Sequence, residues 1–208
     1  MVGREIRGGR VVIFPTDTVY GLGSSPFSRT GVLRCFEIKK RDRQKQMPVL
    51  VSSTSDAERT VNLSETAFAL AKKFWPGALT MVLPCKEAGI APELLGSDNS
   101  LGVRMPDHEC CLKLISASGG CLIGTSANLS GEPSIKDSND GRLKSLSLSC
   151  DYFVSGECGN SEKPSTVIDL TKNGSSRLIR EGQIPFAEIE SYLENINNKD
   201  RSFKVTSS

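Results

Sequence analysis

Residues 10–25 read RVVIFPTDTVYGLGSS and combine two features that together decide the fold. The run RVVIF at 10–14 is apolar and rich in β-branched residues, which is typical of a short buried strand. The segment after it carries two threonines around Asp17 and glycines at 21 and 23. This composition predicts either a tight turn that needs its glycines, or a loop in which a ligand approaches backbone N–H groups.

Strand and helix patterns alternate along the rest of the chain. Four more apolar runs are predicted strands: PVLV at 48–51, LTMVL at 79–83, CLIG at 121–124 and TVIDL at 166–170. Helical patterns are predicted at 28–38, at 64–74 with Ser64 as N-cap, and at 107–117 between Asp107 and the pair Gly119–Gly120. The alternation predicts the α/β class.

The length of 208 residues favours one domain. The last periodic segment, 186–196, predicts an amphipathic helix that packs on the sheet. We therefore expect a single domain over 1–196 and a polar, flexible tail over 197–208. No apolar run reaches the length of a membrane span, and MVGREIRGGR does not have the form of a secretory signal, so we expect a cytoplasmic protein without a membrane partner.

Charge and cysteine usage narrow the class of ligand. The formal net charge is +2, yet KKRDRQK at 39–45 holds five basic residues and one Asp, so the positive field is local and suits a small anion better than a long nucleic-acid track. The seven cysteines are odd in number and form no C-x-x-C pair. We expect reduced packing residues, with no disulfide framework and no zinc ribbon.

Several common catalytic arrangements are missing. The only histidine, His108, begins a predicted helix, and the chain has no G-x-x-x-x-G-K-[ST] phosphate loop. The segment GLGSSP at 21–26 lacks the third glycine of a dinucleotide fingerprint. No acidic cluster has the spacing of a metal cage, so no protein-ligated metal is expected and a bound Mg²⁺ would arrive with phosphates.

Short polar motifs stand instead at strand ends, where open α/β sheets bind ligands. GTSANLSGEPS at 124–134 is either an exposed turn with an Asx cap or a binder of phosphate oxygens through Ser126 and Asn128. Arg104 ends a short extended run, and it either pairs with a structural acid or receives a substrate carboxylate. Ser165 and Arg180 stand at two further strand ends.

These motifs, in this order, resemble the YrdC-like family of threonylcarbamoyl-adenylate synthases. The resemblance runs from about Arg10 to Pro185. It rests on PTDTVYGLG at 15–23, the K-x-R of Lys39 and Arg41, WPGALTMVL at 75–83, GVRMPDH at 102–108, the S-x-N of Ser126 and Asn128, and STVIDL at 165–170. It implies a twisted, open, mixed sheet with flanking helices around a basic concave cavity, in the short, single-domain form of the family.

The resemblance also implies a nucleotidyltransferase that joins L-threonine, bicarbonate and ATP into threonylcarbamoyl-AMP and releases pyrophosphate. Threonylcarbamoyl-AMP is the activated precursor for N6-threonylcarbamoyladenosine (t6A) in tRNA. Mg²⁺ would come with ATP, and a downstream tRNA threonylcarbamoyl transferase would use the product. The implied ATP contacts are Lys39, Arg41, Lys45, Ser100, Ser126, Asn128, Ser134 and Arg180, of which Lys39, Arg41, Ser126 and Asn128 would act in catalysis. The implied threonine contacts are Thr18, Arg104, the Gly124 backbone and Ser165.

Some positions depart from the family pattern. Relatives often have a histidine at or near Ser52, and its absence removes one implied threonine contact. Either Arg41 or Arg43 could face the cavity, and Lys39 and Arg41 can share one phosphate only if residues 39–41 are not helical, because a helix would separate them by about 200°. Two alternatives stay open: a double-stranded RNA or tRNA-binding module, and a domain that handles carbamoyl-adenylate in carbamoyl transfer.

Overall fold

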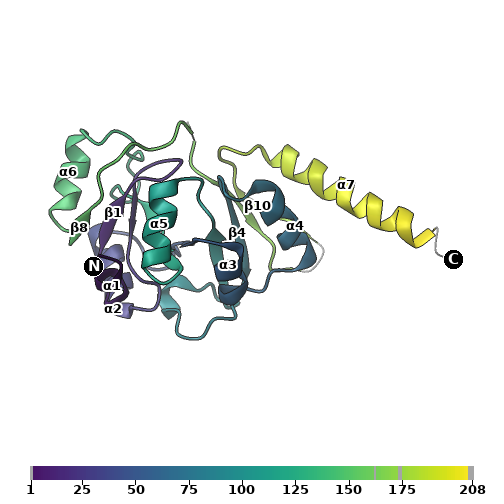
Figure 1. Cartoon of the computed structure of the whole chain (residues 1–208), viewed down its shortest axis with the longest axis horizontal. Helices are drawn as coiled ribbons and strands as arrows, with labels where there is room; N and C mark the ends of the chain where they lie inside the picture. The colour runs from purple at the N-terminus through teal and green to yellow at the C-terminus, as the bar shows by residue number, and fades with distance from the viewer. Residues whose placement is uncertain (1, 162, 173–174, 206–208) are drawn as a thin grey trace.

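Two mixed β-sheets and the helices that flank them form the protein (Figure 1). The structure, a computed structural model, describes residues 2–161, 163–172 and 175–205. The strands are β1 Val12–Phe14, β2 Gly21–Gly23, β3 Val49–Val51, β4 Leu79–Pro84, β5 Ser100–Arg104, β6 Cys121–Ile123, β7 Thr125–Ser126, β8 Tyr152–Phe153, β9 Thr166–Asp169 and β10 Arg177–Arg180. The helices are α1 Val2–Arg7, α2 Arg29–Ile38, α3 Thr54–Thr60, α4 Glu65–Phe74, α5 Glu109–Ala117, α6 Gly141–Ser147 and α7 Phe186–Val205, with a short 3-10 helix at Pro92–Leu94.

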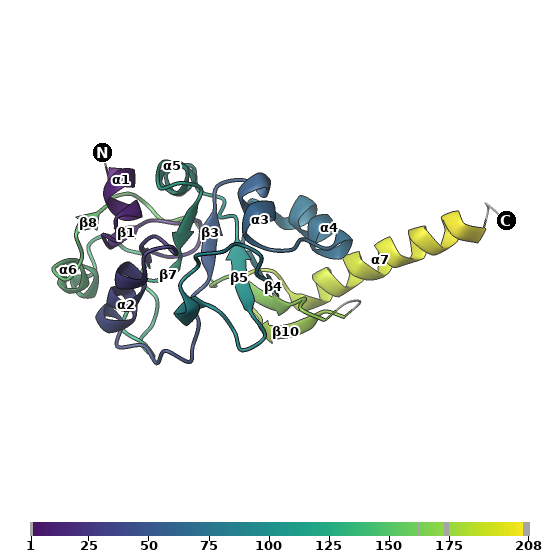
Figure 2. The same cartoon turned by 90° about the horizontal axis from the view of Figure 1, so that it is seen from below.

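The smaller sheet has the order β7-β2-β1-β8 and the larger one β10-β9-β4-β5-β3-β6. Both are mixed, since β1 pairs antiparallel with β2 and parallel with β8, and β4 pairs antiparallel with β5 and parallel with β9. Figure 2 shows β1 and β7 on one side of the molecule and β3, β4 and β5 beside them. The predicted open mixed α/β architecture is confirmed.

The two sheets meet along a run that belongs to both. Strands β6 and β7 are consecutive in sequence with only Gly124 between them, yet they lie in different sheets. At this junction β6 of the larger sheet also contacts the end of β2 in the smaller sheet: Ile123 N donates over 2.9 Å to the backbone oxygen of Ser24, the residue after β2. A Cβ atom on Gly23 would lie 1.8 Å from the oxygen of Ile123, so the junction depends on a residue without a side chain.

The glycines at 21 and 23 therefore do not form the tight turn that was one of two predictions. They form strand β2, and neither needs a positive φ. At Gly21 the ring of Phe14 would lie 2.8 Å from an added Cβ. Close packing of β2 against its neighbours, and not turn geometry, explains both residues.

Helix α2 ends where the basic run KKRDRQK begins. Arg41 N donates to Phe36 O and Lys40 N to Glu37 O, the two bonds of a Schellman motif. Lys40 has φ of 49°, a left-handed conformation that this motif usually gives to glycine. The chain thus leaves the helix before Arg41, which meets the condition for Lys39 and Arg41 to serve one site.

Lys40→Gly is expected to raise the free energy of unfolding by about 1 kcal/mol, because glycine adopts the left-handed region without the Cβ clash. Urea unfolding measures the change. Lys40→Ala keeps the clash and should stay within about 0.5 kcal/mol of the wild type. A Lys40→Gly protein less stable than the Lys40→Ala protein would contradict this account of the helix end.

The predicted N-cap Ser64 accepts from Ala67 N, as expected, and Ser28 caps α2 in the same way by accepting from Gly31 N. Helix α5 begins later than predicted, because His108 and not Asp107 is its cap: His108 Nδ1 accepts from Cys111 N over 3.2 Å. Helix α7 continues past the predicted end at 196 and extends away from the body, opposite α1 (Figure 1). The division into a domain over 1–196 and a tail stays a prediction.

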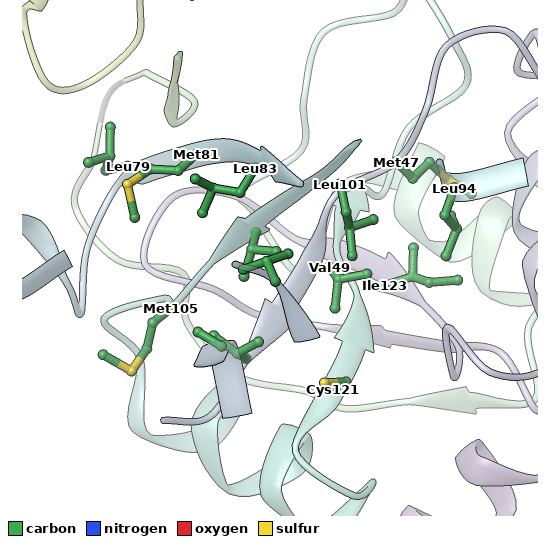
Figure 3. Packing of buried hydrophobic residues seen from close by; sticks show 14 of the residues in the cluster. Met47, Val49, Leu79, Met81, Leu83, Leu94, Leu101, Met105, Cys121 and Ile123 are labelled. Carbon is green, nitrogen blue, oxygen red and sulfur yellow. The ribbon is translucent and has the colours of Figure 1, made fainter. Parts of the chain in front are cut away.

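The main core lies against the larger sheet. Val49 and Ile123 are cross-strand partners, and both are fully buried with Met81 and Leu83 of β4 (Figure 3). Helix α7 joins this core through Ile189 and through Tyr192, whose ring meets Phe74 edge-on at 5.9 Å. None of the helices in the described part of the chain has the length and apolar character that crossing a bilayer requires.

Candidate functional site

A cavity of about 830 Å³ opens between the two sheets. Its walls come from segments far apart in sequence, including the loop before β2, strands β3, β4, β5, β9 and β10, and the run from Gly124 to Ser126. Nine of the twelve predicted site residues line it: Thr18, Arg41, Ser100, Arg104, Gly124, Ser126, Ser134, Ser165 and Arg180. Lys39, Lys45 and Asn128 do not line it.

Four arginines and two aspartates set the charge of the cavity wall: Arg41, Arg104, Arg177, Arg180, Asp98 and Asp169. Arg177 is paired with Asp169 at 2.8 Å, and Arg104 with Asp17 at 2.5 Å. Among the residues that the structure describes, Arg41 and Arg180 have no carboxylate partner. These two guanidinium groups are the cations that can neutralise a bound anion.

The Arg104 guanidinium is held on several sides. Its Nε donates to Gly77 O over 2.9 Å, Nη1 donates to Thr18 Oγ1 over 3.3 Å, and Nη2 lies 2.5 Å from both carboxylate oxygens of Asp17. Of the two predicted roles, the pairing with a structural acid is present. Asp17 is a functional neighbour that the sequence prediction missed, although its place between two threonines was a visible signal.

The loop before β2 is fixed by the hydroxyl of Thr16. Thr16 Oγ1 donates to Val19 O over 2.7 Å and accepts from the backbone N–H of Thr18 and of Val19. The hydroxyl oxygens of Thr16 and Thr18 are also 3.1 Å apart, within hydrogen-bond distance of one another. This local network, together with Arg104, holds the Thr18 side chain at the cavity wall.

Lys39 is buried behind the wall and does not face the cavity. Its ammonium donates to the backbone oxygen of Ser126, to Asn128 O at 2.7 Å and more weakly to Asn128 Oδ1 at 3.5 Å. The amide nitrogen of Asn128 is also occupied, by Leu129 O and Glu132 O. In this arrangement Lys39 and Asn128 shape the loop that presents Ser126, while burial and the nearby Arg41 charge lower the pKa of Lys39 to about 8.

Arg41, and not Arg43, lines the cavity. Arg41 closes its own loop by donating from Nε to Lys45 O over 2.7 Å and from Nη2 to Gln46 O over 3.1 Å. The remaining N–H groups are not used by these bonds and are available to a ligand. Arg41 is partly buried, and this burial lowers the pKa of its guanidinium.

Arg180, Ser165 and Thr80 form the opposite wall. Arg180 Nη2 donates to Ser165 O over 2.9 Å, and the hydroxyl oxygens of Ser165 and Thr80 are 2.9 Å apart. The pKa of Arg180 is lowered, mainly by burial and also by the charges of Arg104 and Arg41. The prediction missed Thr80, because a threonine inside the apolar run LTMVL carries no sign of a ligand site.

Ser52, where relatives often have histidine, lies outside the cavity and donates to Asp56 Oδ2 over 2.6 Å. The cavity carboxylates are also occupied, Asp98 by Ser100 and Asp169 by Thr171 and Arg177. In the described residues no cluster of histidine, cysteine or acidic side chains is placed to hold a metal. The donor set therefore fits Mg²⁺ only as an ion carried by a phosphate ligand.

The chain is similar to proteins named threonylcarbamoyl-AMP synthase. The chain is 38% identical over 199 residues to a threonylcarbamoyl-AMP synthase of Pyrococcus abyssi, covering 92% of this chain and 56% of that protein. It is 42% identical over 130 residues to the Bacillus subtilis protein of the same name, covering 62% of this chain and 38% of that one. The chain thus spans about half or less of the length of these two relatives.

The structure of P. abyssi Sua5 complexed with L-threonine superposes with a TM-score of 0.84 at 36% identity, covering 92% of this chain and 56% of that one. The Sua5_yciO_yrdC family model, described as "Telomere recombination", matches residues 4–182. Both findings confirm the resemblance seen in the sequence motifs. The chain belongs to the Sua5/YciO/YrdC family.

Proposed function

We propose that the protein makes threonylcarbamoyl-AMP from L-threonine, bicarbonate and ATP and releases pyrophosphate. The observation that carries the proposal is the convergence of Arg41, Arg104 and Arg180 from three separate segments on one cavity that also presents threonine and serine hydroxyls. Two unpaired guanidinium groups suit a triphosphate, and the Arg104 and Thr18 end suits an amino acid. The relatives named threonylcarbamoyl-AMP synthase support the same reaction.

In this reaction the threonine amine and bicarbonate form a carbamate with loss of water. A carbamate oxygen then attacks the α-phosphorus of ATP, the bond from that phosphorus to the bridging oxygen breaks, and pyrophosphate leaves. Mg²⁺ brought by ATP would neutralise charge on the leaving group. The chain itself contributes mainly position and charge, with Arg41 and Arg180 on the phosphates and Arg104 and Thr18 on the amino acid.

The product is an activated mixed anhydride, so a second enzyme must transfer its threonylcarbamoyl group. We propose a tRNA threonylcarbamoyl transferase as that partner, in the synthesis of t6A.

The reaction itself is tested by incubating the chain with ATP, ¹⁴C-bicarbonate and threonine and detecting labelled threonylcarbamoyl-AMP and pyrophosphate. Omission of threonine or of bicarbonate should stop pyrophosphate release, whereas ATP turnover that ignores threonine would refute the proposal.

Arg41→Met should lower kcat/KM for ATP by about 10- to 100-fold, because it removes charge-assisted hydrogen bonds to the phosphates. Arg43→Met is the matched control, since Arg43 is an exposed arginine on the same loop that does not line the cavity. Steady-state pyrophosphate release measures both variants. An equal loss in both would mean that the loop contributes only general positive charge.

The affinity for ATP should fall about fivefold between pH 7 and pH 9.5. The pKa of Lys39 is lowered to about 8, so its charge behind Ser126 is present at pH 7 and lost above pH 8. Calorimetric titration at the two pH values measures the change. Lys39→Arg keeps its charge throughout and should show no such fall; an identical fall in this variant would assign the effect to another group.

A further inference from the structure

The ion pair between Asp17 and Arg104 is almost fully enclosed. The side chains are 13% and 7% exposed, and both oxygens of Asp17 lie 2.5 Å from Nη2 of Arg104. The segment around Gly159 packs on the Asp17 backbone, where an added Cβ would lie 2.4 Å from the Asp17 oxygen. Asp17 is therefore a fixed acid behind the cavity wall and not a mobile surface acid.

The hydrogen bonds leave Arg104 with little to offer a ligand. Of its nitrogens, Nε donates to Gly77, Nη2 lies against both oxygens of Asp17, and Nη1 uses one of its two N–H groups on Thr18. One N–H on Nη1 remains. Nη2, one of the two nitrogens that an arginine needs for a two-pronged grip on a carboxylate or phosphate, is thus already turned to Asp17.

Thr18 is similarly committed. Its hydroxyl oxygen accepts from Arg104 Nη1 and lies 3.1 Å from the hydroxyl oxygen of Thr16. The groups that remain at this end of the cavity are therefore an N–H donor on Arg104 and the Thr18 hydroxyl, which can donate or accept. A zwitterionic amino acid offers the matching pair, a carboxylate oxygen and an ammonium N–H, whereas phosphate offers oxygens alone.

The charges point in the same direction. Arg104 is neutralised within the wall, whereas Arg41 and Arg180 have no carboxylate partner in the described parts of the chain. The charges of Arg104 and Arg41 both lower the pKa of Arg180, so the three cations lie near one another. A polyanion in the cavity could therefore bind at any of them. Because Asp17 neutralises Arg104, the polyanion should bind at Arg41 and Arg180.

We propose that Asp17 is a specificity residue that divides the cavity into a neutral end at Arg104, selective for a zwitterionic amino acid, and an anionic-ligand end at Arg41 and Arg180. Asp17 acts by positioning and neutralising Arg104 and takes no part in the chemistry. The identity of the amino acid rests on the proposed function, but the exclusion of phosphate from Arg104 does not.

The test uses calorimetric titration of sodium pyrophosphate and of L-threonine into the full chain. With the wild type, pyrophosphate should bind without competing with threonine. Asp17→Asn should weaken threonine binding about tenfold and create a second pyrophosphate site that competes with threonine, because Arg104 regains an uncompensated charge. The double variant D17N/R104Q should lose this second site. In steady-state kinetics, Asp17→Asn should raise the KM for threonine by a larger factor than it lowers kcat.

Asp151→Asn is the control for loss of a partly buried carboxylate, since Asp151 accepts from Arg34, Arg10 and Val11 away from the cavity. It should leave both titrations unchanged. The proposal is wrong if pyrophosphate and threonine compete for the wild-type protein. It is also wrong if the Asp17→Asn variant binds the same number of pyrophosphate molecules as the wild type. Absence of threonine-dependent ATP turnover would refute only the proposed function, since the pyrophosphate titrations need no turnover.

Discussion

Replacing Gly23 by alanine is expected to lower the free energy of unfolding by about 4 kcal/mol, enough to leave little folded protein. The added Cβ would lie 1.8 Å from the Ile123 oxygen and 2.9 Å from its carbonyl carbon. Both are backbone atoms, so no side chain can turn aside to make room. The two sheets would have to separate at the junction that frames the cavity.

Urea unfolding and the yield of soluble protein measure this effect. Gly141→Ala is the matched control, because Gly141 opens α6 with no atom within 4 Å of an added Cβ. That variant should be neutral or slightly more stable, since alanine is the better helix former. If Gly23→Ala unfolded within 1 kcal/mol of Gly141→Ala, roughly the scatter of surface substitutions, the contact between the sheets would be far looser than described.

Lys39→Met is expected to lower the free energy of unfolding by about 3 kcal/mol and to abolish most pyrophosphate release. Methionine fills a similar volume, but it leaves the oxygens of Ser126 and Asn128 without their donor in a buried place. The loop that presents Ser126 to the cavity would then relax. Both the stability and the catalytic rate should therefore fall together.

Lys45→Met separates this effect from simple loss of charge in the basic loop. Lys45 is exposed and does not line the cavity, so its replacement should change the free energy of unfolding by no more than about 0.5 kcal/mol. Equal destabilisation in the two variants would mean that Lys39 is not the anchor of the Ser126 loop. Urea unfolding at pH 7 makes the comparison.

The sequence predicted the parts of the fold that local physics determines. The five β-branched runs became β1, β3, β4, β6 and β9, and Ser64 began its helix as expected. Helix α6 was missed because it lies in a Ser-, Lys- and Asp-rich stretch and is held mainly by two buried leucines, Leu143 and Leu146. Strand β2 was missed because glycine has low strand propensity, and only the neighbouring sheet explains its use there.

The site was predictable as a set of segments but not as a geometry. The motifs identified nine residues that do line the cavity, including Thr18, Ser126 and Arg180. The inward burial of Lys39 could not be predicted, because it depends on Lys40 taking a left-handed conformation and on a loop almost ninety residues away. The pairing of Asp17 could not be predicted for a similar reason, since its partner Arg104 is distant in sequence.

The order in which the chain leaves the ribosome gives the parallel pairing of β1 with β8 a further meaning. The loop that carries Thr18 follows β1, yet β1 meets its partner Tyr152–Phe153 only after most of the chain has been made. The wall at Ser165 and Arg180 appears later still. Contacts of such long range form late and slowly. Until β8 has been made, the edge of β1 that later pairs with it is exposed, and we expect chaperones to bind β1 during synthesis.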